Sequence, residues 1–366
     1  MTYIHERSAW PSFTWDQTAL QQTLAALRNR QGRLLGRRES LGFDIQADAM
    51  LQTLSDDVVQ SSAIEGEQLP PASVRSSVAR HLGLEPATAE AEDSRVEGIV
   101  AVLFDATHYA QMALTQARLQ LWHRTLFPTG HKPLHPITLG AWRTDARGPM
   151  QVISGPIGRE RVHFEAPAAA RLPHEMRRFL RWFNADDGQN PILRAALAHL
   201  WFVTIHPFDD GNGRIARALA DMCLTRGENG TQRFYSMSSQ ISAERRDYYA
   251  ILEATQRGTL DITPWMAWFL ACLSRALDRS DTALARVLAR AEFWRTHAQE
   301  SFNPRQRLML TRLLDSWEGK LTSSKWAMIC KCSQDTASRD IDDLLRRGIL
   351  HHDGGGGRST GYVVAA

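Results

Sequence analysis

Two strongly apolar segments enclose a short polar stretch just past the middle of the chain. The first reads LRAALAHLWFVTI and ends at residue 205, and the second reads IARALADMCLT and begins at residue 215. Apolar runs of this length are typical of helices, so the sequence predicts two of them. The stretch that joins them, HPFDDGNGRIAR, occupies residues 206–217, and its glycines favour a turn. We therefore expect a helical chain in which a glycine-rich turn opens the second helix of this pair.

The apolar pattern predicts helices in most of the remaining chain. Leu20, Leu24 and Leu27, for example, recur at the spacing of one helix face. The clearest break is MQVISGPIGRERVHF, within residues 150–165, which is typical of two short strands around a glycine-proline turn. The sequence therefore predicts an all-α fold with one small β-hairpin. The expected helices cover residues 15–38, 48–60, 73–81, 90–109, 114–126, 173–183, 191–205, 211–225, 242–256 and 263–297.

The last segment has a pattern of its own. Three expected helices, at residues 303–314, 323–332 and 333–348, precede two expected strands within residues 349–364, around a glycine-rich tip. This order resembles a winged helix-turn-helix, in which Ser338 and Arg339 would face a DNA groove. The alternative is a module that contacts protein or only regulates.

Charge in that segment argues against sequence-specific DNA binding. From residue 305 to the end, the sequence contains 10 Lys and Arg and 7 Asp and Glu, so its net charge is small. The candidate recognition helix itself carries Asp335, Asp340, Asp342 and Asp343, which repel phosphate. We therefore regard DNA contact through residues 305–366 as possible but not favoured.

Composition excludes several classes of protein. The net charge of +3 over 366 residues is too small to indicate nucleic acid or a membrane. The four cysteines of the chain lack the paired spacing of a zinc site. The start, MTYIHERSAW, has no apolar signal core, and ITPWMAWFLACLSRAL is too short to span a bilayer. We expect a cytoplasmic protein with no membrane contact.

The polar stretch combines the groups that phosphoryl or nucleotidyl transfer requires. Residues 211–213 leave backbone amides uncovered at a helix start, which makes a site for anions. Arg214 and Arg217 lie on one side of that helix. Asp210 can hold Mg²⁺ against phosphate oxygens, and His206 can accept a proton near neutral pH.

Together these residues resemble the Fic family signature, H-x-F-x-(D/E)-G-N-G-R-x-x-R, at every specified position. The G-K-(S/T) ending of a Walker A loop is absent, and no alternating strand pattern indicates a dinucleotide fold. The resemblance covers most of residues 1–280. It implies an N-terminal helical domain at 1–90, a Fic catalytic domain at 91–280, and a linker helix with a winged helix at 281–366.

Family resemblance implies transfer of AMP from ATP to a Ser, Thr or Tyr hydroxyl of a target protein or of the protein itself. His206 would be the general base, Phe208 would anchor the loop in the core, and Asp210 would bind Mg²⁺. The hairpin at 150–165 would bind the target as an added strand. A homodimer is plausible on the same ground.

The same resemblance implies the nucleotide contacts. Gly211, Asn212 and Gly213 would hold the α- and β-phosphates, and Asn212 would also offer its side-chain amide. Arg214 would bind the β-phosphate and Arg217 the γ-phosphate. The expected nucleotide-binding residues are Gly211, Asn212, Gly213, Arg214, Ile215, Ala216, Arg217, Tyr249, Val162 and His163, of which Tyr249 can equally be a core residue and the last two can instead touch the target.

A second motif lies near the end of an expected helix, in SSAIEG. Gly66 stands where a helix commonly ends, so Glu65 falls in the last turn, where the helix dipole disfavours a carboxylate. Ser61, Glu65 and Gly66 match the family pattern S/T-x-x-x-E-(G/N), whose glutamate pairs with the last signature arginine, here Arg217. That pair would take the place of the γ-phosphate and inhibit transfer.

Three alternatives to autoinhibited AMP transfer stay open at this point. The first is transfer of another group, such as UMP, phosphate or phosphocholine. The second is removal of AMP from modified proteins, with Glu65 positioning water. The third is a DNA-binding regulator whose Fic body senses nucleotide.

Overall fold

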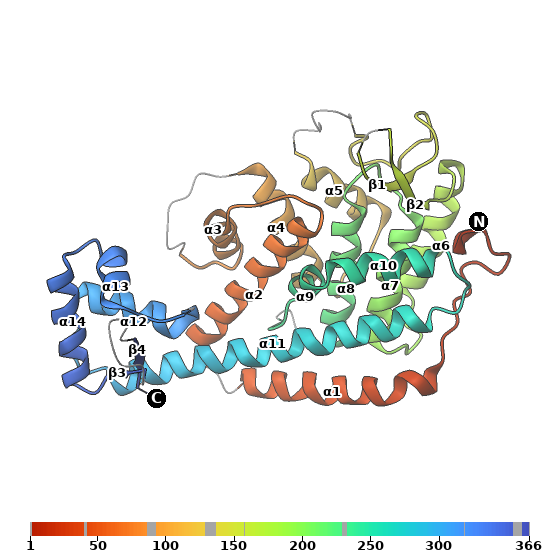
Figure 1. Ribbon diagram of the computed structural model, residues 1–366. Helices are drawn as coiled ribbons and strands as arrows, with labels where there is room; N and C mark the ends of the chain where they lie inside the picture. The colour runs from red at the N-terminus through yellow and green to blue at the C-terminus, as the bar shows by residue number, and fades with distance from the viewer. Residues whose placement is uncertain are drawn as a thin grey trace. The chain divides into compact units, whose positions relative to one another are not determined.

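The computed structural model is mainly helical and separates into two compact units, residues 1–280 and 281–366 (Figure 1). The structure describes residues 2–39, 42–85, 93–128, 137–156, 158–228, 233–317, 319–353 and 361–365. Each unit has its own core, and the long helix α11 (Thr263–Thr296) runs across the boundary. The division into three domains that the sequence suggests stays a prediction.

The first unit is a stack of helices with one hairpin. Its elements are η1 (Ile4–Glu6), α1 (Gln17–Glu39), α2 (Phe43–Ile64), α3 (Pro71–His81), α4 (Ser94–His108), α5 (Gln116–Leu126), β1 (Gln151–Ser154), β2 (Arg161–Glu165), η2 (Ala169–Arg171), α6 (Leu172–Asn184), α7 (Pro191–Ile205), α8 (Asn212–Gly227), α9 (Met237–Ala243), α10 (Arg245–Gln256) and the first part of α11.

Helices α7 and α8 form the centre of this unit and confirm the predicted apolar pair. They pack against each other along their length, with α4, α5 and α6 around them (Figure 1). Leu200 and Phe202 of α7 and Ile215 and Leu219 of α8 are fully buried, as expected for the apolar faces of two core helices. The loop between α7 and α8, which contains the polar stretch, is therefore fixed by the two most buried elements of the unit.

Helix α2 packs on α3, α4, α8 and α9 and carries the SSAIEG motif at its end. It begins at Phe43, five residues before the predicted start, and continues to Ile64. Glu65 caps it, and Gly66 takes a left-handed conformation with φ of 83°, as the predicted helix end requires. The described residues of this early part, 45–48, are only half-buried, and burial begins at Ala49.

A break in the helical conformation at Glu244 was not predicted. The expected helix at residues 242–256 corresponds to α10, which begins at Arg245, and Glu244 separates it from α9, most of which lies before the predicted start. The carboxylate of Glu244 pairs with Arg275 of α11 and accepts a hydrogen bond from Gln240. This long-range ion pair is invisible to the apolar periodicity, which runs on through the break.

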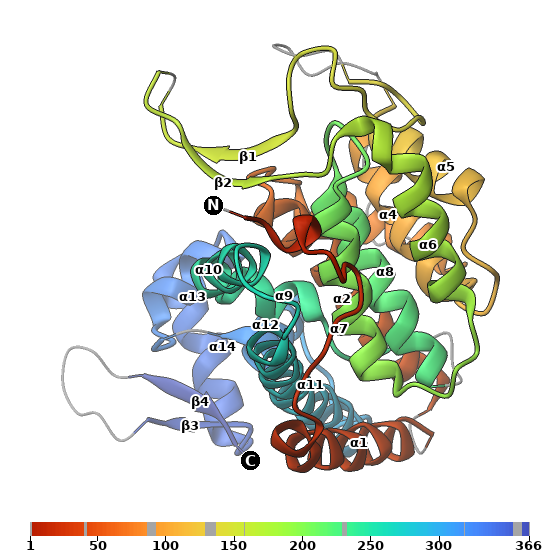
Figure 2. The same cartoon turned by 90° about the vertical axis from the view of Figure 1, so that its right-hand side faces the viewer.

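The predicted hairpin is present as β1 and β2, antiparallel and with a bulge between Val152 and Ile153. It extends from the helical body (Figure 2), and α10 holds it from one side. Arg257 donates to the carbonyl oxygens of Val162 (2.6 Å) and His163 (2.9 Å). The outer edge of β2 is thus joined to the body.

The second unit has the predicted order of three helices and two strands. These are α12 (Pro304–Ser316), α13 (Ser323–Cys330), α14 (Gln334–Arg346), β3 (Leu350–His352) and β4 (Tyr362–Val364), and the strands pair antiparallel. Trp326, Leu310, Ile341 and Leu350 fill its core. Most of the glycine-rich tip falls outside the described residues, and a winged helix stays a prediction.

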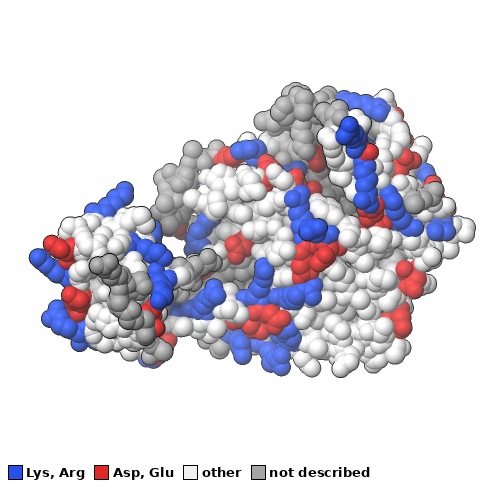
Figure 3. Space-filling model, viewed as in Figure 1, with Lys and Arg blue, Asp and Glu red and all other residues white. Residues whose placement is uncertain are grey.

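Charges on the second unit are of both signs. Asp340 of the candidate recognition helix is buried and paired with Arg305 (2.7 Å), while Asp343 pairs with Arg347 (3.1 Å). On the face drawn in Figure 3, Lys and Arg of this unit are interspersed with Asp and Glu. No helix among the described residues has the length and apolar character that crossing a membrane requires.

Candidate active site

The polar stretch forms a tight loop whose first residue has an unusual backbone. His206 ends α7 in the left-handed region, with φ of 53°, which few residues other than glycine adopt. Arg143 holds this turn from outside: its Nε donates to His206 O (2.7 Å), and its backbone N–H donates to Pro207 O (2.9 Å). Arg143 is buried and also donates to Pro167 O (2.6 Å). No sequence pattern marks this arginine, and the prediction missed it.

The imidazole of His206 is oriented as a general base. Its Nδ1 lies 3.1 Å from the carbonyl oxygen of Val203, which can only accept, so Nδ1 carries the proton of the neutral ring. Nε2 is then the nitrogen with a free lone pair. Burial lowers the pKa of His206 to about 4, so the ring is neutral at physiological pH. A neutral ring with an exposed Nε2 lone pair can take a proton from a hydroxyl.

Phe208 and Asn212 close the loop. Phe208 is fully buried and its ring stacks on His123 at 4.2 Å, which fits the expected anchor. The side chain of Asn212 accepts from Phe208 N (3.0 Å) and donates to Phe208 O (2.8 Å). Only the second N–H of this amide could serve a phosphate, because the first donates to Phe208 O, so the expected phosphate contact of Asn212 stays a prediction.

The start of α8 has the geometry of an anion-binding helix N-terminus. Gly211 precedes the helix with φ of 78°, and the first amides of a helix have no acceptor within it. Ile215 and Ala216 are fully buried, and Ile215 N donates to Gly211 O (3.0 Å). Their side chains are thus enclosed in the core, and the predicted nucleotide contact of these two residues stays a prediction.

Glu65 lies directly over this helix start. A Cβ placed on Gly213 would overlap Oε1 of Glu65 and come within 3.2 Å of Nη1 of Arg217. Only glycine at position 213 leaves room for a carboxylate, or for another anion of similar size, against the backbone. A carboxylate of the protein thus fills the space that the sequence analysis assigns to phosphate.

Arg217 is held by the end of α2. Its Nη2 lies 2.8 Å from Oε1 of Glu65 and 2.8 Å from Ser61 O, while its Nε donates to Ser61 Oγ (2.9 Å). Burial disfavours the charge of this guanidinium, yet the carboxylate of Glu65 outweighs that and raises the pKa of Arg217. The predicted inhibitory residues Ser61 and Glu65 therefore meet the last signature arginine.

A second ion pair, which the sequence analysis did not anticipate, joins the same two segments. Nη1 of Arg214 lies 3.0 Å from Oε2 of Glu67, and its guanidinium stacks over the ring of Phe127. Glu67 follows Glu65 by two positions, on the turn after α2. The only available sequence signal was this extra acid after the motif. Both arginines assigned to phosphates thus carry a carboxylate partner from the N-terminal region.

Asp210 lies beside the helix start, and its Oδ1 accepts from Gly211 N (2.7 Å). The described residues contain no group of three or more metal-ligating side chains. A single carboxylate suits Mg²⁺, which takes most of its ligands from water and substrate phosphates in such sites. Asp210 therefore fits a metal that arrives with a nucleotide.

Tyr249, Val162 and His163 lie around α10 and the hairpin. Tyr249 is 39% exposed, and its hydroxyl donates to Ile64 O (3.2 Å), so it touches the inhibitory turn. His163 bonds through Nδ1 to Glu253 (2.6 Å). Tyr249 also interacts electrostatically with Arg217 of the polar stretch. The nucleotide roles of Tyr249, Val162 and His163 stay predictions.

Two family models match this chain. Residues 113–224 match the Fic/DOC family, and residues 3–84 match a domain of unknown function, DUF4172. A protein adenylyltransferase Fic of Nematostella vectensis is 28% identical over 240 residues, which are 63% of this chain and 49% of that protein. Another, of Drosophila melanogaster, is 35% identical over 114 residues, or 31% of this chain and 22% of that protein. The chain thus matches about half or less of these curated relatives.

Solved structures show the same fold. A Fic family protein from Desulfovibrio desulfuricans has a TM-score of 0.55 at 19% identity, covering 94% of this chain and 96% of that one. A Fic domain-containing signalling protein from Bacteroides thetaiotaomicron has a TM-score of 0.53 at 21% identity, covering 72% of this chain and 98% of that one.

Proposed function

Because this chain carries a Fic domain at residues 113–224, we propose that it is a protein adenylyltransferase. It transfers AMP from ATP to a Ser, Thr or Tyr hydroxyl of a target protein or of itself. The observation that carries the proposal is the arrangement around the start of α8. A neutral imidazole ends α7, and the first turns of α8 carry the terminal helix amides and two buried arginines beside it.

In this mechanism the acceptor hydroxyl attacks the α-phosphorus of ATP. A bond forms between the hydroxyl oxygen and the α-phosphorus, and the bond from that phosphorus to pyrophosphate breaks. Nε2 of His206 takes the hydroxyl proton. The amides at residues 211–213 bind the α- and β-phosphates, and Arg214 and Arg217 stabilise the charge on the leaving pyrophosphate. Asp210 holds Mg²⁺, which neutralises phosphate charge when bound.

We also assign autoinhibition to this protein. In its resting form, Glu65 pairs with Arg217 and lies against Gly213, while Glu67 pairs with Arg214. A triphosphate cannot use either arginine fully until these carboxylates leave. Displacement of phosphates by about 1 Å is enough to lower a rate by roughly 100-fold, since the α-phosphorus no longer lies in line with the hydroxyl.

The target segment docks on the hairpin. Arg257 donates hydrogen bonds to the carbonyl oxygens of Val162 and His163 on the outer edge of β2. The outer edge of β1 is therefore the one that an added strand of the target would pair with. Ile153 on that strand is 54% exposed and can contact an apolar side chain of the target.

The test uses ATP labelled at either the α- or the γ-phosphate. The Glu65→Gly variant is incubated with each label, Mg²⁺ and a lysate, with Glu65→Gly/His206→Ala as the matched control. Adenylyl transfer predicts protein-bound label from α-labelled ATP only, and none with the control. Label from γ-labelled ATP would show phosphate transfer instead. Release of AMP from modified protein, without new labelling, would favour the hydrolytic alternative.

A further inference from the structure

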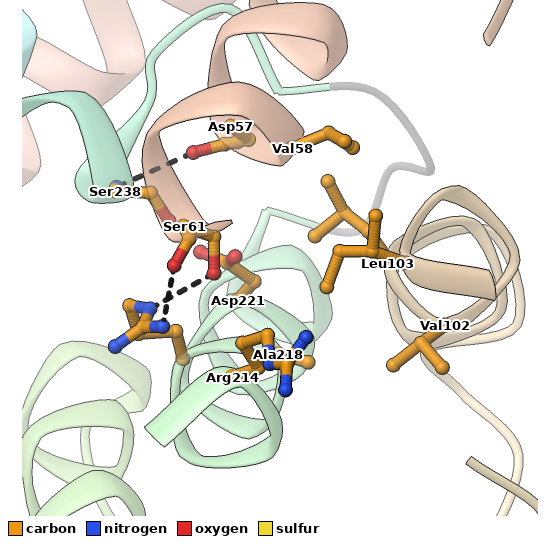
Figure 4. A pocket seen from close by; sticks show the side chains of 11 residues that line it. Asp57, Val58, Ser61, Val102, Leu103, Arg214, Ala218, Asp221 and Ser238 are labelled. Carbon is orange, nitrogen blue, oxygen red and sulfur yellow. Dashed lines mark hydrogen bonds between the residues drawn. The ribbon is translucent and has the colours of Figure 1, made fainter. Parts of the chain in front are cut away.

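Two carboxylates are buried one turn away from the inhibitory contact. Asp57 lies one turn before Ser61 on α2, and Asp221 lies one turn after Arg217 on α8. Their exposed fractions are 0% and 1%. Figure 4 shows Asp57, Ser61, Asp221 and Arg214 around one small pocket between α2 and α8. The face of α2 that inhibits and the face of α8 that binds phosphate therefore share a buried acidic pair.

One cation serves both acids. Nη2 of Arg233 lies 2.8 Å from Oδ1 of Asp221 and 3.4 Å from Oδ2 of Asp57. Among the described residues, Arg233 is the only side-chain cation within ion-pair distance of either carboxylate. Two carboxylates and one guanidinium leave one negative charge in excess, in a place that water hardly reaches. Burial of such a charge is unfavourable unless a proton neutralises it.

Neighbouring elements do not supply the missing positive charge. From the segment before α9 and from α9 itself, Asp57 accepts bonds from Ser236 Oγ and Ser238 N. Arg217 acts on Asp221 from one turn away but is paired with Glu65. Within the described residues, the other groups near this pair are the apolar Val58, Ile99, Val102, Leu103 and Ala218 and the cation Arg214 with its partner Glu67. Tyr235 and Glu228 act on Arg233.

The pKa values of Asp57 and Asp221 reflect this excess of buried negative charge. Burial, and then the charge of Asp221, raise the pKa of Asp57 to about 7. Burial raises the pKa of Asp221 in the same direction, although Arg233 opposes it. The docked arrangement therefore holds one proton, shared by the pair, over the range in which an ordinary aspartate has already lost it.

We propose that docking of α2 on α8 takes up one proton, shared by Asp57 and Asp221, so that autoinhibition is tight in mild acid and relaxes toward pH 8. This inference rests on the proposed function, because it assumes that docked α2 inhibits transfer. It adds a regulatory signal that the Glu65 contact alone does not contain.

The sign of this pH dependence follows from the linkage between proton binding and docking. When α2 leaves α8, Asp57 meets water and its pKa returns toward 4, so the undocked form has lost the proton from about pH 5 upward. Between about pH 5 and pH 8 the docked form still holds a proton that the undocked form has lost. Raising the pH through this range removes that proton and therefore disfavours docking. With a docked pKa of about 7, the docking equilibrium weakens by about tenfold between pH 6 and pH 8 and changes little above that.

The experiment measures label transfer from α-labelled ATP at pH 6, 7 and 8 for the unaltered protein and for Glu65→Gly. Dividing the rate of the unaltered protein by the rate of Glu65→Gly at each pH cancels the pH dependence of the chemical step itself. We expect this ratio to rise by up to about tenfold from pH 6 to pH 8. A ratio that stays flat, with Glu65→Gly active throughout, overturns the proton latch. Inactivity of Glu65→Gly would instead reject the proposed function.

Three variants and a second readout locate the proton. Asp57→Asn and Asp221→Asn each remove one titrating group and are expected to make the ratio independent of pH. Asp56→Asn is the matched control on α2, because its carboxylate accepts from Gln52 instead, and it should keep the pH dependence. Hydrogen exchange of the α2 amides in the unaltered protein should speed up by a similar factor between pH 6 and pH 8, after correction for intrinsic exchange. Loss of the pH dependence in Asp56→Asn alone, or pH-independent corrected exchange, contradicts the proposal.

Discussion

Oε1 of Glu65 lies 2.8 Å from Nη2 of Arg217, and the same oxygen would overlap with a Cβ on Gly213. The guanidinium is 3% exposed, whereas the carboxylate is 31% exposed. Water and ligands can therefore reach the acid but not the arginine behind it. A triphosphate that needs Arg217 has to displace the end of α2 first.

Removing the charge of Glu67 should release Arg214. In Glu67→Gln the side chain keeps its size but loses the ion pair at 3.0 Å, so we expect transfer to rise by about fivefold, the equivalent of roughly 1 kcal/mol for a partly exposed pair. The same change in the Glu65→Gly background should add a further increase. Initial rates with α-labelled ATP measure both effects.

A suitable control for that experiment is Glu97→Gln, whose carboxylate pairs with Arg80 away from the loop. Its rate should equal that of the unaltered protein. Equal rates for Glu67→Gln and the unaltered protein, in both backgrounds, would mean that Glu67 does not restrain Arg214.

His206→Ala, in the Glu65→Gly background, should lower transfer by at least about 100-fold, because the acceptor hydroxyl loses its base. ATP binding, measured by calorimetry, should change little, since the imidazole contacts the acceptor and not the phosphates. Retention of more than a tenth of the rate would exclude His206 as the base.

The pH profile gives an independent test of the same residue. Burial lowers the pKa of His206 to about 4, so its neutral form persists as the pH falls from 8 to 5.5. We expect no loss of rate from protonation of this base in that interval for Glu65→Gly, measured with saturating ATP. An acid limb with a midpoint near 6.5, the ordinary value for histidine, would contradict the buried geometry.

Arg143 is expected to position His206 without touching substrate. In Arg143→Ala the carbonyl oxygens of His206 and Pro167 lose their donor, so kcat should fall by about tenfold or more while KM for ATP changes less than twofold. Unfolding in urea should show a loss of roughly 1–3 kcal/mol from the orphaned buried groups. Arg147→Ala, at an exposed arginine of the same loop, is the matched control and should leave kcat unchanged. A fall in kcat equal to that control would rule out the positioning role.

Much of the central fold followed from local pattern. The helices α7 and α8 contain long apolar segments, so their sequence predicts them, and the glycines between them mark the turn. The end of α2 was predicted because Gly66 marks it. Its start and the break at Glu244 were missed, since Glu244 is set by an ion pair with Arg275, which lies 31 positions further along the chain.

The same distinction holds for the site. A local motif located His206, Arg214 and Arg217, and a second motif located Glu65. Arg143 and the Asp57–Asp221 pair became visible only in three dimensions, because their partners are distant in sequence. Asn212 was assigned to phosphate by resemblance, and no spacing reveals that its amide also closes the loop on Phe208.

The central claim is that Arg217 cannot serve Glu65 and a triphosphate at once. The most direct measurement compares initial rates of label transfer from α-labelled MgATP at pH 7 for the unaltered protein, Glu65→Gly and Glu65→Asp. We predict a rise of about 100-fold or more for Glu65→Gly and a smaller rise for Glu65→Asp, whose shorter acid still carries the charge. Equal rates for the unaltered protein and Glu65→Gly, with both proteins folded and binding ATP, would contradict it.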